Sequence, residues 1–433
     1  MSHSPSTISR RGENPIEPIN PIVDGTARTK RALIVSEDLT FRERAGNSAY
    51  LAAFCLLLRS LGYRVSILVY GSTPSRTWRS GIEPQYLAAV DDILARNTLR
   101  VGRYFLSMRL RTWLRILFGP AKAVARAGRA AILKRGPRYT PWELAWPNER
   151  ETNWVRKHIG KFNPDLLIAN YFNAAPIFGE FDRPCKKAIL VHDVFSSRRE
   201  SYRAAGLPFD IDQTAPAREI EAFAKADLCL TITPSEADFI RRACPRTLTA
   251  VLPHVLDAAA RSETQPSGER CIFVGSNNDS NRRGAAWLLR EVWPQVLKRR
   301  PNARLRLIGR MPLEPSLPLD GVEVAGLVGD LDAEYSQAKL ALVPLLAGSG
   351  LKIKLVEALA HGVPVVATTC GAEGVPMASS RFLQIHDDAA PFAAAICEMI
   401  AASDWRTRSR AAASYAKLNF STATALKLLN QVL

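Results

Sequence analysis

A loop of small residues followed by a predicted helix is the clearest candidate for a ligand-binding site in this sequence. A predicted strand ends at Pro344, and a helix is predicted over 351–361. The amide groups of Ser349, Gly350 and Leu351 would lack intrahelical partners at the start of this helix, where the helix dipole is positive. Such a helix start favours a bound phosphate, because unpaired N–H groups and the dipole both attract an anion.

Three charged side chains in the same segment fit this interpretation. Lys352 and Lys354 stand in the first predicted turn, where each positive charge costs roughly 0.3–1 kcal/mol against the dipole, which suggests that an anion binds there. Glu357 lies one turn deeper, and its carboxylate can accept two hydrogen bonds from a diol such as a ribose. The alternative is an ordinary strand-to-helix turn with solvated lysines.

Three other loops that follow predicted strands carry polar or small residues. Residues 275–284 lead into a helix, and Arg282 or Arg283 could bind a phosphate through two N–H groups. His192 ends a strand and could handle a proton or hydrogen-bond a sugar, although a single histidine in such a place is more often structural. Gly46 follows the first strand, in a loop that lacks the GxGxxG pattern of dinucleotide-binding domains.

The order of predicted elements is that of an α/β protein with parallel sheets. An apolar strand at 32–35, a helix at 48–61 with apolar side chains on one face, a glycine and a strand at 64–69 form a βαβ unit. Such units recur in two series, so we expect two doubly wound domains with a ligand in the cleft between them. The expected division is a disordered tail (1–28), an N-terminal domain (29–256), a polar linker (257–269), a C-terminal domain (269–410) and a C-terminal helix (411–433).

The net charge of +17 is concentrated in one segment. Between residues 96 and 142 there are twelve Lys or Arg and no Asp or Glu. A helix over 100–119 would place apolar side chains on one face, and we expect it to be either a solvated crossover helix or an amphipathic helix on an anionic membrane surface. Nucleic-acid binding is disfavoured, because no aromatic stacking platform or recognised module is present. The apolar face would consist of Leu106, Leu110, Trp113 and Leu117.

The remaining composition excludes several classes of protein. An apolar fraction of 47% excludes a mainly disordered chain. The seven cysteines are scattered without a CxxC pair, which favours a reducing compartment over a disulfide or zinc framework. No apolar run is long enough to span a bilayer, and the N-terminal residues lack the apolar region of a signal peptide. These features predict a cytoplasmic protein.

The segment from Ile272 to Gly374 closely resembles the C-terminal domain of the family-4 (group 1) glycosyltransferases. The shared pattern includes FVGSNNDSN, LIGR and LVPLLAGSGLKIKLVEALAHGVPVVATTCGAEG at fixed spacings. The N-terminal half resembles the family more loosely, at the Gly46 loop, NPDLLIANY and ILVHDVFSSR. The resemblance implies a GT-B fold, with two Rossmann-like domains facing a cleft and a C-terminal helix that crosses back to the N-terminal domain. It also implies transfer with retention at the anomeric carbon, no metal, and no cofactor besides a nucleotide-diphosphate sugar as co-substrate.

The resemblance also implies roles for individual residues. Glu357 matches the second Glu of the family's E-x7-E motif, which binds the nucleotide ribose, and Arg283 stands where the family usually has a Lys that binds the diphosphate. His192 matches the active-site histidine, and Gly46 the glycine near the reacting phosphate. The chain departs from the family at Ser349 and at 276, where a Glu and an Arg are usual. Lys352 and Lys354 are expected to replace the lost positive charge, and the missing Glu affects how the sugar ring is held.

Together these features predict a retaining, metal-independent hexosyltransferase. Its acceptor would be a glycan or a lipid-linked molecule in cell-surface polysaccharide or glycolipid synthesis, reached in the cytoplasm or at the inner face of the plasma membrane through residues 96–142. Arg283, Lys352 or Lys354 and the loop amides would stabilise the leaving diphosphate, and His192 would position the sugar or the acceptor. The alternatives are a sugar-nucleotide epimerase of the same fold, and a non-catalytic membrane or nucleic-acid binding protein with a degenerate site.

Overall fold

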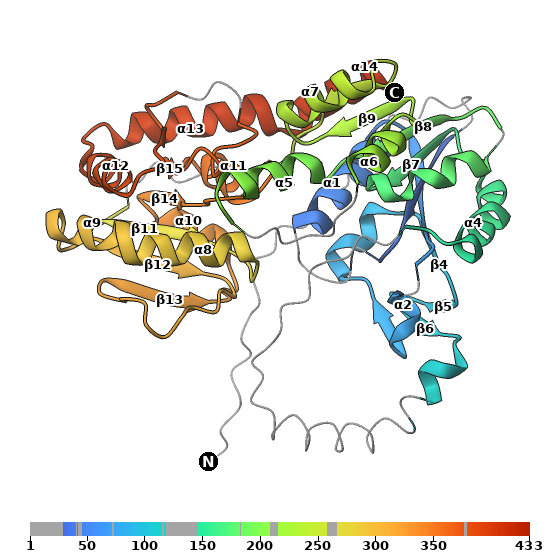
Figure 1. The fold of residues 1–433 in the computed structure, drawn as a ribbon, viewed down its shortest axis with the longest axis horizontal. Coiled ribbons are helices and arrows are strands. Elements are labelled where there is room, and N and C mark those ends of the chain that lie inside the picture. Colours follow the sequence, from blue (N-terminus) through green and yellow to red (C-terminus); the bar gives the residue numbers. More distant parts are fainter. Residues whose placement is uncertain are drawn as a thin grey trace, which may run out of the picture.

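The computed structural model describes residues 29–39, 41, 46–71, 73–114, 117, 146–181, 183–207, 215–257, 266–375 and 379–433. Two parallel sheets lie next to each other, each covered by helices, and a small antiparallel sheet extends from the first one (Figure 1). The predicted tail 1–28 and most of the predicted linker lie outside the described residues. The part of the basic segment from 118 to 142 also lies outside them.

The N-terminal domain is built on a seven-stranded parallel sheet with the order β10-β9-β8-β7-β1-β2-β4. Its central strands are buried on both faces, which is why they read as continuous apolar runs in the sequence. The strands are β1 (Lys30–Ser36), β2 (Tyr63–Val69), β4 (Asp92–Ala95), β7 (Leu166–Asn170), β8 (Lys186–Leu190), β9 (Leu228–Thr231) and β10 (Leu248–Val251). The helices around them are α1 (Gly46–Ser60), α2 (Thr73–Arg76), α4 (Glu149–Phe162), α5 (Phe195–Ala204), α6 (Pro216–Phe223) and α7 (Pro234–Ala243), with 3-10 turns at Pro84–Ala89 and Phe172–Glu180.

The C-terminal domain is built on a six-stranded parallel sheet with the order β13-β12-β11-β14-β15-β16. The strands are β11 (Arg270–Val274), β12 (Arg304–Ile308), β13 (Val322–Gly326), β14 (Leu340–Val343), β15 (Val365–Ala367) and β16 (Leu383–Ile385). The helices are α8 (Asp279–Trp287), α9 (Trp293–Arg299), α10 (Leu331–Gln337), α11 (Ile353–Ala360), α12 (Ala389–Ala401), α13 (Trp405–Phe420) and α14 (Thr422–Val432), with a π turn at Leu288–Val292 between α8 and α9.

Each sheet has a point where the strand order reverses. In the C-terminal domain β11 lies between β12 and β14, and in the N-terminal domain β1 lies between β2 and β7. The loops that leave neighbouring strands on either side of such a point diverge and open a crevice for a ligand. The expected pair of doubly wound domains is therefore confirmed, and the crevices lie at the carboxyl ends of the strands.

The predicted helix over 100–119 is wrong in its first half. Residues Thr98–Val101 (β5) and Tyr104–Ser107 (β6) form an antiparallel hairpin, which joins β3 (Arg79–Gly81) in a three-stranded sheet. Gly102 stands first in the two-residue loop with a φ of 58°, a conformation that suits glycine and closes a tight hairpin. Helical residues follow only at 110–114.

Two helices of the C-terminal domain begin elsewhere than predicted. The helix expected to start at residue 284 begins at Asp279, because the Asn278 side chain accepts a hydrogen bond from the amide of Asn281 (2.8 Å) and so caps it. The helix expected to start at residue 351 begins at Ile353. Lys352 therefore lies before the first turn of α11 instead of inside it.

The chain crosses between the domains twice. It leaves the N-terminal domain after β10 and returns at Ser421, where α13 ends and α14 begins. Helix α13 packs in the C-terminal core, whereas Ala425 and Leu429 of α14 belong to the N-terminal core, so the return lies later than residue 411. The two crossings are bonded to each other, since the Leu256 amide donates to the Phe420 carbonyl (2.8 Å) and the Thr422 amide to Asp257 (3.1 Å).

Candidate functional site

Two loops meet at the crevice of the C-terminal domain. One follows β11 and leads into α8, and the other follows β14 and leads into α11; the two strands are neighbours in the sheet. Ser280 at the start of α8 donates a hydrogen bond to the carbonyl of Ala347 in the second loop. Gly284 allows the close approach, because a Cβ there would lie 2.6 Å from the carbonyl oxygen of Pro344. The structure thus brings the two predicted donor loops together in one wall.

The cations of this wall already have protein partners. The Lys354 ammonium donates to the Asn281 side chain and lies 5.0 Å from the centre of the Phe273 ring. Burial, reinforced by the charge of Lys352, lowers the pKa of Lys354 to about 7. Lys352 is buried and bonds to the Gly350 carbonyl (2.6 Å) and to Glu373 (3.0 Å), so its charge is balanced within the protein.

The other two predicted donor-binding side chains are held on either side of these loops. Arg283 projects from α8 and pairs with Asp279 of the same helix (2.6 Å). The hydroxyl of Tyr335 donates to the Glu357 carboxylate (3.1 Å) and fixes its orientation on α11. Burial raises the pKa of Glu357, and the hydrogen bond from Tyr335 opposes that effect.

The small-residue loop reaches across to the N-terminal domain. The Gly348 amide donates to Ser201 of α5 (3.2 Å), whereas the amides of Ser349, Gly350 and Leu351 have no acceptor within the described parts of the chain. Gly350 has a φ of 75°, and a Cβ at this position would lie 3.7 Å from Glu236 and 3.9 Å from the His192 carbonyl. The loop that would bind a phosphate therefore lies directly against the opposite domain.

His192 is fixed by its neighbours at the end of β8. Its Nε2 lies 2.6 Å from the Asn170 side-chain oxygen, and because the Asn170 amide nitrogen donates to Ser36, Nε2–H is the donor. The imidazole stacks on Tyr171 with ring centres 4.1 Å apart. Burial lowers the pKa of His192 to about 3, so the ring is neutral at physiological pH and can offer hydrogen bonds to a ligand but not the proton of an imidazolium.

Gly46 lies at the start of α1, close to this histidine. Burial raises the pKa of Tyr171 to about 12, and a hydrogen bond with the side chain of Asn47, the residue after Gly46, opposes that rise. Because Tyr171 stacks on His192, the start of α1 and the end of β8 share one face of the N-terminal domain. The structure therefore brings the start of α1, His192 and the 348–350 loop together where the two domains meet, a place here called the cleft.

Two acidic residues that the sequence did not single out also lie in this cleft. Ser349 donates a hydrogen bond to Asp193, whose carboxylate also pairs with Arg198 (3.0 Å). Glu236 accepts from the amides of Ile232 (3.2 Å) and Thr233 (3.0 Å) and caps α7. The histidine-aspartate pair at a strand end, and the TPSE pattern of a capping box, were the signals available.

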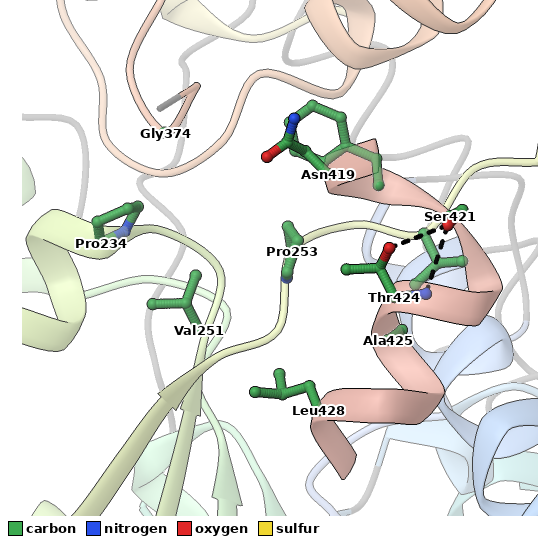
Figure 2. A pocket seen from close by; sticks show the side chains of 11 residues that line it. Pro234, Val251, Pro253, Gly374, Asn419, Ser421, Thr424, Ala425 and Leu428 are labelled. Atoms are coloured by element: carbon green, nitrogen blue, oxygen red, sulfur yellow. Dashed lines mark hydrogen bonds between the residues drawn. The ribbon is translucent and has the colours of Figure 1, made fainter. Parts of the chain in front are cut away.

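A cavity lies away from these loops, at the crossing between the domains. It has a volume of about 270 Å³ and an apolar lining that comes from both domains (Figure 2). None of the predicted site residues lines it. Its walls are Pro234, Val251, Pro253, Val255, Gly374, Asn419, Phe420, Ser421, Thr424, Ala425 and Leu428.

Two further findings concern only the described part of the chain. No group of three His, Cys, Asp or Glu side chains there could hold a metal ion. No helix among the same residues is both long and apolar enough to cross a membrane.

Comparison with known proteins finds a family model that matches the C-terminal domain. Residues 268–402 match the family model described as "Glycosyl transferases group 1". A Klebsiella pneumoniae protein described as an uncharacterized 44.6 kDa protein in the cps region is 28% identical over 134 residues, which cover 28% of this chain and 34% of that protein. The match therefore spans about a third of the relative's length.

Solved structures resemble the whole described chain. Sucrose-phosphate synthase from Thermosynechococcus elongatus superposes with a TM-score of 0.61 and 15% identity, over 93% of this chain and 98% of its own. Anabaena HepE in complex with UDP superposes with a TM-score of 0.61 and 13% identity, over 93% of this chain and 99% of its own. TarM of S. aureus, in a complex that contains UDP, superposes with a TM-score of 0.62 and 8% identity, over 93% of this chain and 99% of its own. These likenesses show that the fold is GT-B.

Proposed function

We propose that this protein transfers a sugar from a nucleotide-diphosphate sugar to an acceptor hydroxyl, because residues 268–402 match the model of the group 1 glycosyltransferases. The observation that carries the proposal is the contact of the loop after β14 with both the loop after β11 and the 192–193 segment of the opposite domain. Cations and amides that have no acceptor in the described parts of the chain therefore lie near a fixed neutral histidine. HepE and TarM, which share the fold, were solved in complexes that contain UDP.

In the proposed mechanism the protein stabilises charge on the leaving group. The diphosphate gains negative charge as its bond to the sugar breaks, and Arg283, Lys354 and the amides of 349–351 are preorganised donors on one side of it. Lys354, whose pKa is about 7, becomes fully protonated when an anion binds beside it. The acceptor attacks from the face that the diphosphate leaves, a phosphate oxygen takes its proton, and the reaction proceeds with retention and without a metal.

The other residues of the cleft position the two substrates. Glu357, oriented by Tyr335, binds the ribose of the nucleotide, and Gly46 lets the chain approach the reacting phosphate. His192, locked by Asn170 and Tyr171, holds the transferred sugar or the acceptor. Lys352 acts indirectly, because its ammonium is bonded to the Gly350 carbonyl and so shapes the loop.

We place the reaction in cell-surface polysaccharide or glycolipid synthesis, with a hexose donor and a glycan or lipid-linked acceptor. The relative in the cps region supports this setting. The second support is a surface of the N-terminal domain, here called the insert surface, on which large apolar side chains are exposed. It consists of Trp78, Leu99, Val101, Met108, Leu110, Trp113, Leu114 and Leu117.

The insert surface has the chemistry of a membrane-binding surface. Among the described residues it contains most of the large apolar side chains that are exposed, with Leu110 at 72% and Leu117 at 71%. The guanidinium of Arg79 lies over the rings of Trp78 and Tyr104, 4.9 and 4.8 Å from their centres, so a cation lies beside the apolar residues. Tryptophan and arginine beside exposed leucine favour the boundary of an anionic bilayer.

The position of the insert in the sheet fits this role. Its β5–β6 hairpin follows the carboxyl end of β4, and because all strands of this sheet are parallel, that end lies at the same sheet edge as His192 after β8. Two hydrogen bonds anchor it, from Ser107 and Thr112 to the Ser75 carbonyl (2.8 and 2.7 Å). We propose that the protein works in the cytoplasm at the inner face of the plasma membrane.

Release of nucleoside diphosphate from a panel of nucleotide-sugars tests the transferase proposal. The wild-type protein should release UDP or GDP from at least one donor, and His192→Ala and Glu357→Ala should lower kcat/KM by roughly 100-fold. Arg290→Ala is the control, because Arg290 forms only an exposed pair with Glu314 on the outside of the domain. Conversion of the donor sugar without release of diphosphate would favour an epimerase, and no turnover of any donor would favour a binding protein.

A further inference from the structure

The N-terminal domain places two acids against the phosphate-binding loop of the C-terminal domain. Asp193 accepts a hydrogen bond from Ser349, and Glu236 lies on the other side of the same loop, facing Gly350. The two side chains are 9% and 1% exposed, so neither is an ordinary surface acid. The loop itself, 348–350, carries no acid.

One carboxyl oxygen of Glu236 accepts no hydrogen bond from the described part of the chain. Its Oε2 accepts the amides of Ile232 and Thr233 at the start of α7, whereas Oε1 has no hydrogen-bond partner in the described part of the chain. A Cβ on Gly350 would lie 3.7 Å from Oε1, so this oxygen points across the cleft. A buried polar atom without a partner costs about 1–3 kcal/mol, which a bound ligand can offset.

The cations and the two buried acids belong to different domains. Arg283 and Lys354 lie in the C-terminal domain, and Asp193 and Glu236 lie in the N-terminal domain, where Arg198 balances the charge of Asp193. The cations attract a diphosphate. Hydroxyl groups, by contrast, are good partners for carboxyl oxygens. The division fixes the direction in which an elongated donor can lie.

We infer that Asp193 and Glu236 bind hydroxyl groups of the donor's sugar, from the opposite domain, while the diphosphate lies against Arg283 and Lys354. This inference rests on the proposed function. The pair with Arg198 (3.0 Å) orients the Asp193 carboxylate, which also accepts a hydrogen bond from Ser349. Burial, and then the charge of Asp193, raise the pKa of Glu236 to about 8, so at neutral pH Glu236 is protonated and offers an O–H donor beside the acceptor oxygens of Asp193.

The alternative role for Asp193 is a purely structural one. Its bond to Ser349 and the bond from Gly348 to Ser201 join the two domains, so Asp193 would serve only to keep the cleft closed. The two roles differ in what they do to ligands. A sugar-binding acid affects only ligands that carry a sugar, whereas a closure bond affects the nucleotide and the nucleotide-sugar alike.

Calorimetric titration of the full-length protein with UDP and with UDP-glucose separates these roles; if UDP does not bind, GDP and GDP-mannose replace them. The quantity compared is the ratio of the two dissociation constants, nucleotide over nucleotide-sugar. Asp193→Asn should lower this ratio about tenfold or more and leave nucleotide affinity unchanged, because a hydrogen bond to a charged group is lost only to the sugar. Ser349→Ala removes the same interdomain bond but keeps the carboxylate, so its ratio should stay near that of the wild type.

Asp238→Asn is the matched control, since Asp238 lies on α7 in an exposed pair with Arg241 (2.9 Å). Should Asp193→Asn fail to fold, Asp193→Ser provides the same comparison. An unchanged ratio in the Asp193 variants, an equal loss in Ser349→Ala, or a wild-type ratio of one overturns the inference and leaves the transferase proposal standing. A wild-type protein that binds neither nucleotide overturns both.

Discussion

The two domains use their charged residues in opposite ways. In the C-terminal domain the cations of the site are paired with acids, as the buried Lys352 is with Glu373 and the half-buried Arg283 with Asp279. In the insert of the N-terminal domain, Arg79 stacks on the exposed ring of Trp78 and Arg103 on the half-buried ring of Tyr104, beside apolar side chains that nothing in the described chain covers. The first arrangement is preorganised for a small anion, and the second is suited to a broad surface.

The difference shows that positive charges in different parts of one molecule can serve different purposes, so the net charge alone does not identify the ligand. A buried cation acts through a few short contacts and is screened little by salt, whereas exposed cations act together over about 10 Å and weaken as salt is added. Substitutions in one domain should therefore leave the role of the other unchanged. The predictions below test this separation, from the largest expected effect to the smallest.

Arg283→Ala should produce the largest effect. It removes a donor from the developing charge of the diphosphate, so kcat/KM for release of nucleoside diphosphate should fall by about 100-fold or more. Binding to anionic vesicles should not change, because Arg283 lies on α8 of the opposite domain. A loss of vesicle binding in this variant would contradict the separation of the two regions.

The reciprocal change is Leu110→Ser combined with Leu117→Ser. Both side chains are almost fully exposed, so the variant should fold normally and release nucleoside diphosphate as the wild type does in the absence of lipid. Its partition onto vesicles that contain anionic lipid, measured by sedimentation, should fall by roughly 10-fold or more, because apolar burial in the bilayer is lost.

Three outcomes bear on that experiment. The wild type should pellet with anionic vesicles at low salt, and less at high salt. No pelleting at low salt would contradict the membrane proposal. Concentration-dependent dimers that disappear in the double variant would show instead that the insert surface binds a second copy of the chain.

Glu236→Gln should produce a smaller, pH-dependent effect on stability. The pKa of Glu236 is raised to about 8 in the folded protein, so between about pH 4.5 and pH 8 the unfolded chain has lost a proton that the folded chain keeps. Stability from this group is complete at low pH and decreases as the pH rises through that window. Gln cannot ionise, so the variant should gain in Tm relative to the wild type as the pH increases from 5 to 8.

The groups that face Glu236 allow a control for this measurement. Asp193 and Glu373 lie close enough to influence its ionisation, and Tyr50 responds to its charge. Asp238→Asn, on the same helix but exposed, should show no such trend in Tm. A constant difference between Glu236→Gln and the wild type at all pH values would contradict the assignment.

Much of the fold could be predicted because its signals are local. The strand at 32–35 and the helix at 48–61 follow from apolar periodicity, and the structure has both within two residues. The hairpin at Thr98–Ser107 could have been found from its glycine and alternating side chains. It was missed because Leu106, Leu110 and Trp113 also fit a helical spacing, and periodicity alone does not choose between two patterns in a short segment.

The site was predicted less completely because its contacts are distant in sequence. The loop at 348–350 was recognised, but nothing local indicates that Ser349 bonds to Asp193 or that Lys352 is neutralised by Glu373. Those pairings depend on how the two domains meet and on how the chain returns after α11. Residue type predicts what a side chain can do, whereas its partners come from the tertiary structure.

The paired crossings at Leu256–Phe420 and Asp257–Thr422 have a mechanical consequence. Two chain segments that are bonded side by side resist twisting more than one segment does, because a twist would stretch the bonds between them. We therefore expect relative movement of the domains to be a rotation about the line of these crossings, next to the apolar cavity of Figure 2. Substrate entry and product release at the far edge of the cleft would then follow a single degree of freedom.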